Sequence, residues 1–139
     1  MKALLDTCVI MDFLQRREPF AENAKKIMQA SAMEMFDGFI TAKSATDIYY
    51  LTHRCTHCDK ESRNKLSKLL TIINMLDNKA DDVFSAIPSE VSDFEDAVMI
   101  ETAARSQMDC IVTRNKKDYA KSSVTVYTPE QFIELIEKL

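Results

Sequence analysis

Short apolar runs alternate with longer amphipathic stretches along the chain. Apolar runs with the length of strands occupy residues 2–5, 39–41, 74–76, 110–113 and 124–127, the last as an edge strand. Apolar residues at helical spacing occupy 9–17, 20–35, 44–53, 61–73 and 130–138, and two further stretches end at Ile87 and near Ala104. This alternation predicts one α/β domain over residues 1–139, with a short central parallel β-sheet flanked by helices.

Individual residues mark the ends of several elements. Asp6 or Thr7 can cap the first helix, and Pro129 opens the last one. Gly38 is the only glycine and is expected to form a turn before the second strand. Residues 54–59, RCTHCD, are expected to connect two helices.

Four aspartates stand close to the expected ends of strands or starts of helices. Asp6 and Asp118 follow apolar runs, whereas Asp47 and Asp96 lie within amphipathic helical patterns. In an open α/β sheet, groups at the carboxyl ends of the strands converge on one crevice. Carboxylate oxygens suit Mg²⁺ or Mn²⁺, and such an ion activates water and offsets charge on a phosphoryl group. The pattern therefore predicts a divalent-metal site that can hydrolyse phosphodiesters.

Four segments occur in the order and at about the intervals of PIN-domain proteins: LLDTCVIMDFL, ITAKSATDIYYL, DFEDAVMIETAA and IVTRNKKDY. From Lys2 to about Tyr127 the chain resembles a VapC-type toxin ribonuclease of that family. The resemblance implies a single PIN-like domain and an endoribonuclease that depends on Mg²⁺ or Mn²⁺. It also implies a cognate antitoxin protein and a homodimer.

The resemblance also assigns metal ligands. Asp6 matches the first acid of the family and Asp96 the third. Asp47 falls at the second acidic position, where many members carry Glu, so this shorter side chain is expected to act through water. At the fourth position Asp118 matches an acid of the family, and Asn115 stands close to where many members place one.

Other polar residues near these motifs are secondary candidates. Asp93 is expected to cap a helix, with metal ligation as the alternative. Thr113 could hold a metal-bound water or a phosphate through its hydroxyl. Asp12 is expected to face solvent on the first helix. The run Arg114, Lys116 and Lys117 lies beside the proposed acids and is expected to guide RNA.

Composition limits the other possibilities. The net charge of -4 argues against strong nonspecific binding to nucleic acid, although a nuclease can bridge phosphate through metal ions. No apolar run approaches the length of a membrane span, and Asp6 and Asp12 interrupt any signal-peptide pattern, so a cytoplasmic protein is expected. With one glycine the chain has no phosphate-cradling loop, which disfavours nucleotide cofactors.

The cysteines are expected to be reduced thiols. Cys8 and Cys110 stand among apolar neighbours and are expected to lie in the core. Cys55 and Cys58 share a six-residue segment with both histidines, which resembles a zinc site in composition only. Structural zinc sites use two separated ligand pairs, so this segment is expected to be an exposed connection without a native metal.

Two alternatives to a ribonuclease stay open. One is a degenerate PIN-like module that has lost ligands at the second and fourth positions and acts only by binding proteins. The other is a metal-dependent nuclease acting on DNA or flap structures, which the small size and the absence of extra DNA-binding elements disfavour.

Overall fold

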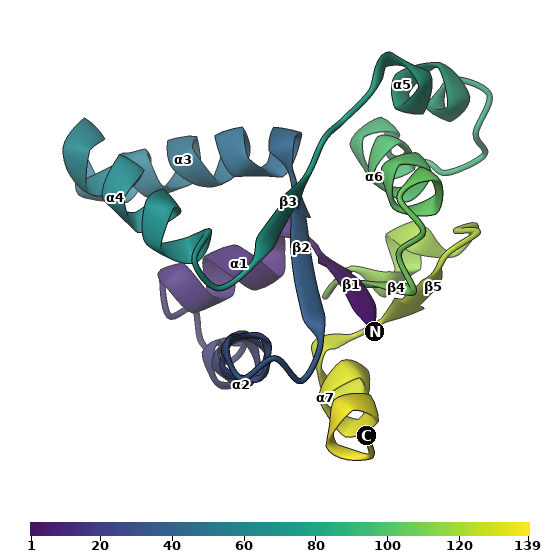
Figure 1. The fold of residues 1–139 in the computed structure, drawn as a ribbon. Helices are drawn as coiled ribbons and strands as arrows, with labels where there is room; N and C mark the ends of the chain where they lie inside the picture. Colours follow the sequence, from purple (N-terminus) through teal and green to yellow (C-terminus); the bar gives the residue numbers. More distant parts are fainter.

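The computed structural model describes residues 1–139 and contains five strands and seven α-helices (Figure 1). The strands are β1 (Lys2–Leu5), β2 (Asp37–Thr41), β3 (Asn74–Leu76), β4 (Cys110–Val112) and β5 (Thr125–Tyr127). The helices are α1 (Thr7–Leu14), α2 (Ala21–Ala32), α3 (Ala42–Thr56), α4 (Asp59–Leu69), α5 (Ala80–Ala86), α6 (Phe94–Arg105) and α7 (Pro129–Glu137). One 3₁₀ turn, η1 (Lys116–Tyr119), follows β4.

The strands form one sheet in the order β3-β2-β1-β4-β5, and every neighbouring pair is parallel. The predicted parallel α/β fold is confirmed. β5 is an edge strand, as the sequence predicts. The central position of β1 follows from its composition, because Ala3, Leu4 and Leu5 are apolar, lack any exposed surface and can be covered on both faces of the sheet.

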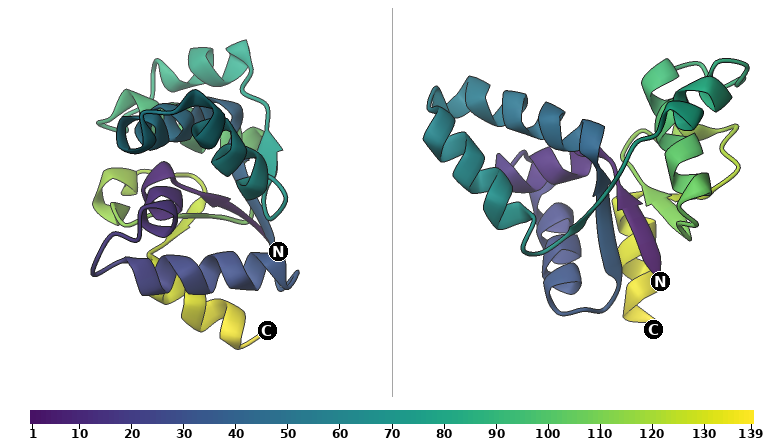
Figure 2. Two further views of the ribbon diagram at one scale, coloured as in Figure 1. Left: turned by 90° about the vertical axis from the view of Figure 1, so that its left-hand side faces the viewer. Right: turned by 45° about the horizontal axis from the view of Figure 1, so that its top comes forward.

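Alternating residues of the central strands enter two separate apolar clusters. Ala3 and Leu5 of β1 belong to the larger cluster, which also takes in residues of α1, α2, α3 and α7. Leu4 and Ile111 point the other way, into a smaller cluster completed by α6. Figures 1 and 2 show the result, with α5 and α6 on one side of the sheet and α1, α2 and α7 on the other. The two termini lie close together in all views.

Two boundary predictions are wrong. Gly38 lies inside β2 rather than in a turn, at a place where α2 packs so closely that an added Cβ would be 2.8 Å from Ser31 Oγ. The segment 54–59 is mostly helical, since α3 continues to Thr56 and α4 begins at Asp59. His57 ends α3 with a left-handed conformation, φ 52°. None of the helices has the length and apolar character to cross a membrane.

Candidate active site

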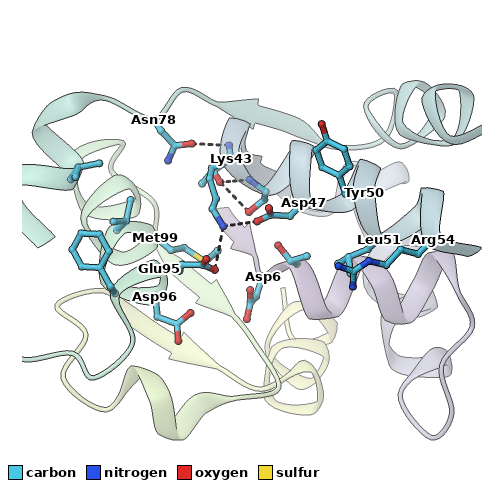
Figure 3. A pocket seen from close by; sticks show the side chains of 16 residues that line it. Asp6, Lys43, Asp47, Tyr50, Leu51, Arg54, Asn78, Glu95, Asp96 and Met99 are labelled. Atoms are coloured by element: carbon cyan, nitrogen blue, oxygen red, sulfur yellow. Dashed lines mark hydrogen bonds and ion pairs between the residues drawn. The ribbon is translucent and has the colours of Figure 1, made fainter. Parts of the chain in front are cut away.

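A cavity of about 540 Å³ opens at the carboxyl ends of β1 and β2, between α3 and α6 (Figure 3). Three of the predicted ligands, Asp6, Asp47 and Asp96, line it. They come from three separate parts of the chain, and Figure 3 shows their side chains directed into the same space. The cavity is also lined by Glu95, an acid that the sequence analysis did not single out.

Asp6 stands immediately after β1, at the N-cap of α1, but its carboxylate does not cap the helix. Its backbone nitrogen donates to Val112 of β4 at 3.0 Å. Its carboxylate oxygen Oδ2 accepts hydrogen bonds from Thr113 Oγ1 at 2.7 Å and from Cys8 Sγ at 3.5 Å. The carboxylate is therefore held by neutral donors and carries its charge into the cavity.

The positions of Thr113 and Cys8 differ from those predicted from the sequence. Thr113 is fully buried, and besides donating to Asp6 it accepts from the backbone nitrogen of Asn115 at 3.1 Å. Its hydroxyl thus positions Asp6 rather than facing the cavity. Cys8 is half-buried beside the core, whereas Cys110 is buried as predicted. Burial and the nearby charge of Asp6 raise the pKa of Cys8 to about 11, so the thiol stays protonated and can donate.

Asp96 lies in the first turn of α6. Asp93 is the N-cap of this helix, as predicted, and accepts a hydrogen bond from the Asp96 backbone nitrogen at 2.9 Å. The buried Tyr119 hydroxyl donates to Asp96 Oδ1 at 3.0 Å. Burial raises the pKa of Asp96 to about 6 despite this bond, and the charges of Asp93, Asp6 and Asp118 act in the same direction. The surroundings of Asp96 therefore favour a bound cation.

Asp47 lies on α3 and already has a cation beside it. Lys43 Nζ is 2.6 Å from Asp47 Oδ2 and 3.2 Å from Glu95 Oε2 (Figure 3). Lys43 thereby links α3 to α6 across the cavity. The Asp47 side chain, shorter than the Glu expected at this position, thus has its carboxylate bound to a lysine.

The residues predicted for the fourth acidic position lie outside the cavity lining. Asp118 is exposed in η1, and Asn115 is exposed just before it. Asp118 is nevertheless close enough to Asp96 for its charge to raise the pKa of that carboxyl. Lys116 and Lys117 are also exposed in η1, and Lys116 Nζ donates to Gln131 at 3.0 Å.

Asp12 does not face solvent, so that prediction is wrong. Its side chain is 2% exposed and accepts hydrogen bonds from Arg114 Nε at 2.6 Å and Nη2 at 3.2 Å. The Arg114 guanidinium also lies 4.0 Å above the ring of Phe20. Arg114, predicted to guide RNA, is thus paired with a buried acid and holds the loop after β4 against α1.

The sequence profile of the PIN domain matches residues 2–117. The chain belongs to the PIN domain family. This confirms the family resemblance seen in the four segments, and the matched region ends one residue before Asp118. No curated protein matches the chain.

Solved structures share the fold of this PIN domain. A toxin–antitoxin complex from Klebsiella pneumoniae is 23% identical, with a TM-score of 0.68 over 91% of this chain and 97% of that chain. VapBC2 from Rickettsia felis bound to a promoter DNA fragment is 13% identical, with a TM-score of 0.63 over 92% and 98%. FitAcB from Neisseria gonorrhoeae is 17% identical, with a TM-score of 0.67 over 92% and 98%.

The donor chemistry of this PIN domain fits a hard divalent cation. The cavity offers carboxylate oxygens and no histidine or cysteine, which suits Mg²⁺ or Mn²⁺. Asp6 and Asp96 take part in none of the ion pairs of the structure. No three acidic, histidine or cysteine side chains are grouped closely enough to enclose an ion by themselves. Magnesium commonly uses one or two carboxylates and keeps several waters, so a pair of carboxylates such as Asp6 and Asp96 fits its chemistry.

Proposed function

We propose that this PIN domain is an Mg²⁺- or Mn²⁺-dependent endoribonuclease and acts as the toxin of a toxin–antitoxin pair. The observation that carries the proposal is the convergence of Asp6, Asp47 and Asp96, from three parts of the chain, on one cavity at the carboxyl ends of the strands. Asp6 and Asp96 lack cationic partners, so their charges are available to a metal ion.

In the proposed reaction a water oxygen attacks the phosphorus of an RNA phosphodiester in line with the leaving oxygen. The bond between phosphorus and the leaving oxygen breaks, and that oxygen gains a proton, which yields a phosphate monoester and a hydroxyl. A divalent ion, when bound, activates the water and offsets the developing negative charge. Asp6 and Asp96 would hold the ion, while Thr113 and Tyr119 keep these two carboxylates in place through hydrogen bonds.

Asp47 and Asp118 have supporting parts in this proposal. Asp47 acts through water, because Lys43 already engages its carboxylate. Asp118 adds negative charge near Asp96. Asp93 serves mainly to cap α6, and Asn115 serves mainly to fix the loop after β4 through its backbone bond to Thr113.

Lys116 and Lys117 are proposed to guide RNA toward the acids, because they are exposed in the turn that carries Asp118. Arg114 is not proposed to contact RNA, because its charge is neutralised by the ion pair with Asp12. Changing Lys116 and Lys117 to Glu should weaken single-stranded RNA binding and flatten its salt dependence while leaving Mn²⁺ affinity nearly intact.

The proposed partners are a cognate antitoxin and a second copy of the chain, in the cytoplasm. One of the structural neighbours is a toxin–antitoxin complex, which supports the antitoxin. Co-purification with the product of a neighbouring small gene tests this partner, and light scattering of the purified protein tests the homodimer.

The proposed activity is tested by Mn²⁺ calorimetry and cleavage of a diverse RNA pool. Wild-type protein should bind Mn²⁺ and cleave, whereas Asp6→Asn and Asp96→Asn should lose both properties and Asp96→Asn should keep most RNA binding. Asp37→Asn is the matched control, since Asp37 is exposed at the amino end of β2. Absence of cleavage by the wild type, or cleavage that persists in both variants, would contradict the proposal.

A protein-binding module without catalysis is the second candidate. Two expected metal ligands favour it: Asp47 is paired with Lys43, and Asp118 lies outside the cavity lining, so neither carboxylate is free in the cavity to bind a metal ion. Mn²⁺ affinity separates the two candidates. A wild-type protein that binds an antitoxin but neither Mn²⁺ nor RNA would be such a module.

A further inference from the structure

Lys43 is a cation within an acid-lined cavity, and nothing in the sequence motifs marks it as functional. It is the second residue of α3, which begins directly after β2, and its backbone nitrogen donates to Asn78 Oδ1 at 2.9 Å. Its ammonium group binds Asp47 at 2.6 Å and Glu95 at 3.2 Å. Figure 3 shows the side chain extending between α3 and α6 toward these two acids.

The charges around the cavity fall into two sets. Asp6 and Asp96 have no cationic partner, whereas Asp47 and Glu95 share Lys43. Four carboxylates together would balance two divalent ions. Lys43 offsets one of the two charges of Asp47 and Glu95, and the remaining pair, Asp6 and Asp96, balances one divalent ion. Although partial burial lowers the pKa of Lys43, its hydrogen bonds with Asp47 and Glu95 raise it overall, so the ammonium is charged at neutral pH.

The other basic side chain lining the cavity, Arg54, lies away from the acids. Arg54 makes no ion pair, and Figure 3 shows it beside Leu51, on the far side of the cavity from Asp96. Lys43 is therefore the one basic group placed among the acids.

We propose that the Lys43 ammonium takes the place of a second divalent ion: the protein holds one ion at Asp6 and Asp96, and Lys43 contacts a phosphate oxygen of RNA on the Asp47–Glu95 side. This inference rests on the proposed ribonuclease function. An ammonium group has three N–H donors. Asp47 accepts one of them at 2.6 Å, and the ion pair with Glu95 at 3.2 Å fixes the direction of the side chain, which leaves a donor for a phosphate oxygen.

Exposure of the side chain agrees with such a contact. The Lys43 side chain is 47% exposed, so a phosphate can reach it without rearrangement of the fold. A lysine ammonium is a compact point charge, which suits a single phosphate oxygen. A merely structural surface ion pair would contribute little to stability, and its removal would leave the number of bound metal ions unchanged.

The experiment combines Mn²⁺ calorimetry with RNA cleavage for wild type, Lys43→Gln, Lys43→Arg and Lys60→Gln. The wild type should bind one Mn²⁺ per chain. Lys43→Gln should bind two, because Asp47 and Glu95 are freed. At an Mn²⁺ concentration that fills only the site at Asp6 and Asp96, it should cleave about 10²-fold more slowly than wild type, as expected when one charge-stabilising donor is lost. Lys43→Arg keeps the charge and should still bind one. Lys60 is exposed on α4, away from the cavity, and Lys60→Gln should behave as wild type.

Several results would overturn the inference while leaving the nuclease function intact. These are two Mn²⁺ ions in active wild-type protein, or a single Mn²⁺ in Lys43→Gln whether or not cleavage changes. Wild-type protein that neither binds Mn²⁺ nor cleaves RNA would instead remove the proposed function itself. Melting curves verify that the variants are folded, and Lys43→Arg provides the charge-retaining comparison should Lys43→Gln fail to fold.

Discussion

Replacing Arg114 by methionine should lower the free energy of unfolding by about 3–5 kcal/mol, because the change leaves a buried carboxylate without its cation. The Asp12 side chain is 2% exposed and that of Arg114 is 24% exposed, so water replaces little of the lost interaction. Both guanidinium bonds to Asp12 disappear, as does the contact with Phe20, which adds about 0.5–1 kcal/mol.

The corresponding change in melting temperature follows from the size of the domain. An unfolding entropy of about 2.1 cal/mol/K per residue gives about 0.3 kcal/mol per degree for 139 residues, so Arg114→Met should melt roughly 10–17 °C lower. Thermal and urea unfolding followed by circular dichroism measure the loss. The double variant Asp12→Leu/Arg114→Met should recover much of it, because both charged partners then leave the interior together.

A matched control comes from Arg63, which pairs with Asp59 on the surface of α4. The Arg63 side chain is 75% exposed, and Arg63→Met should leave the melting temperature essentially unchanged. A loss below about 1 kcal/mol for Arg114→Met, or a double variant as unstable as the single one, would refute the reasoning about the buried pair.

Three further outcomes are expected. Asp96→Asn should raise the free energy of unfolding by about 1 kcal/mol at pH 7 and leave it unchanged below pH 4. The reason is that burial raises the pKa of Asp96 from 3.8 to about 6, so ionisation of this partly buried carboxyl destabilises the folded state as the pH rises through that interval. Urea titrations at the two pH values measure the difference. Thr113→Val should weaken Mn²⁺ binding roughly 10-fold in calorimetry, since Asp6 loses its 2.7 Å hydrogen bond; equal affinity would exclude the positioning role. Replacing Cys55 and Cys58 together by Ser should barely change stability or cleavage; stoichiometric zinc in untreated protein, lost with folding in the double variant, would contradict this.

The sequence predicts most of the fold because its signals there are local. The strands β1 and β4 are short apolar runs, and Asp93 and Pro129 mark helix starts by chemistry within one turn. The burial of Asp12 escapes such reasoning because its partner, Arg114, lies 102 positions further along the chain. A polar residue on a helix is ordinarily solvated, and only the three-dimensional packing shows otherwise.

The candidate site was predictable to a similar extent. The family pattern points to Asp6, Asp47 and Asp96, and the cavity contains all three. Lys43 stands four residues before Asp47, a spacing that by itself suggests an ion pair on a helix. Its second partner, Glu95, comes from α6, and no sequence spacing connects the two residues.

The sheet order makes the cavity a late product of protein synthesis. β1 is the first strand of the chain, yet it lies between β2 and β4, and Asp6 is fixed by the Val112 carbonyl and the Thr113 hydroxyl. A nascent chain that ends before Cys110 has no β4, and its Asp6 has neither anchor. The proposed ribonuclease would therefore lack a fixed Asp6, and with it the assembled acid site, until the residues of β4 and Thr113 have been synthesised.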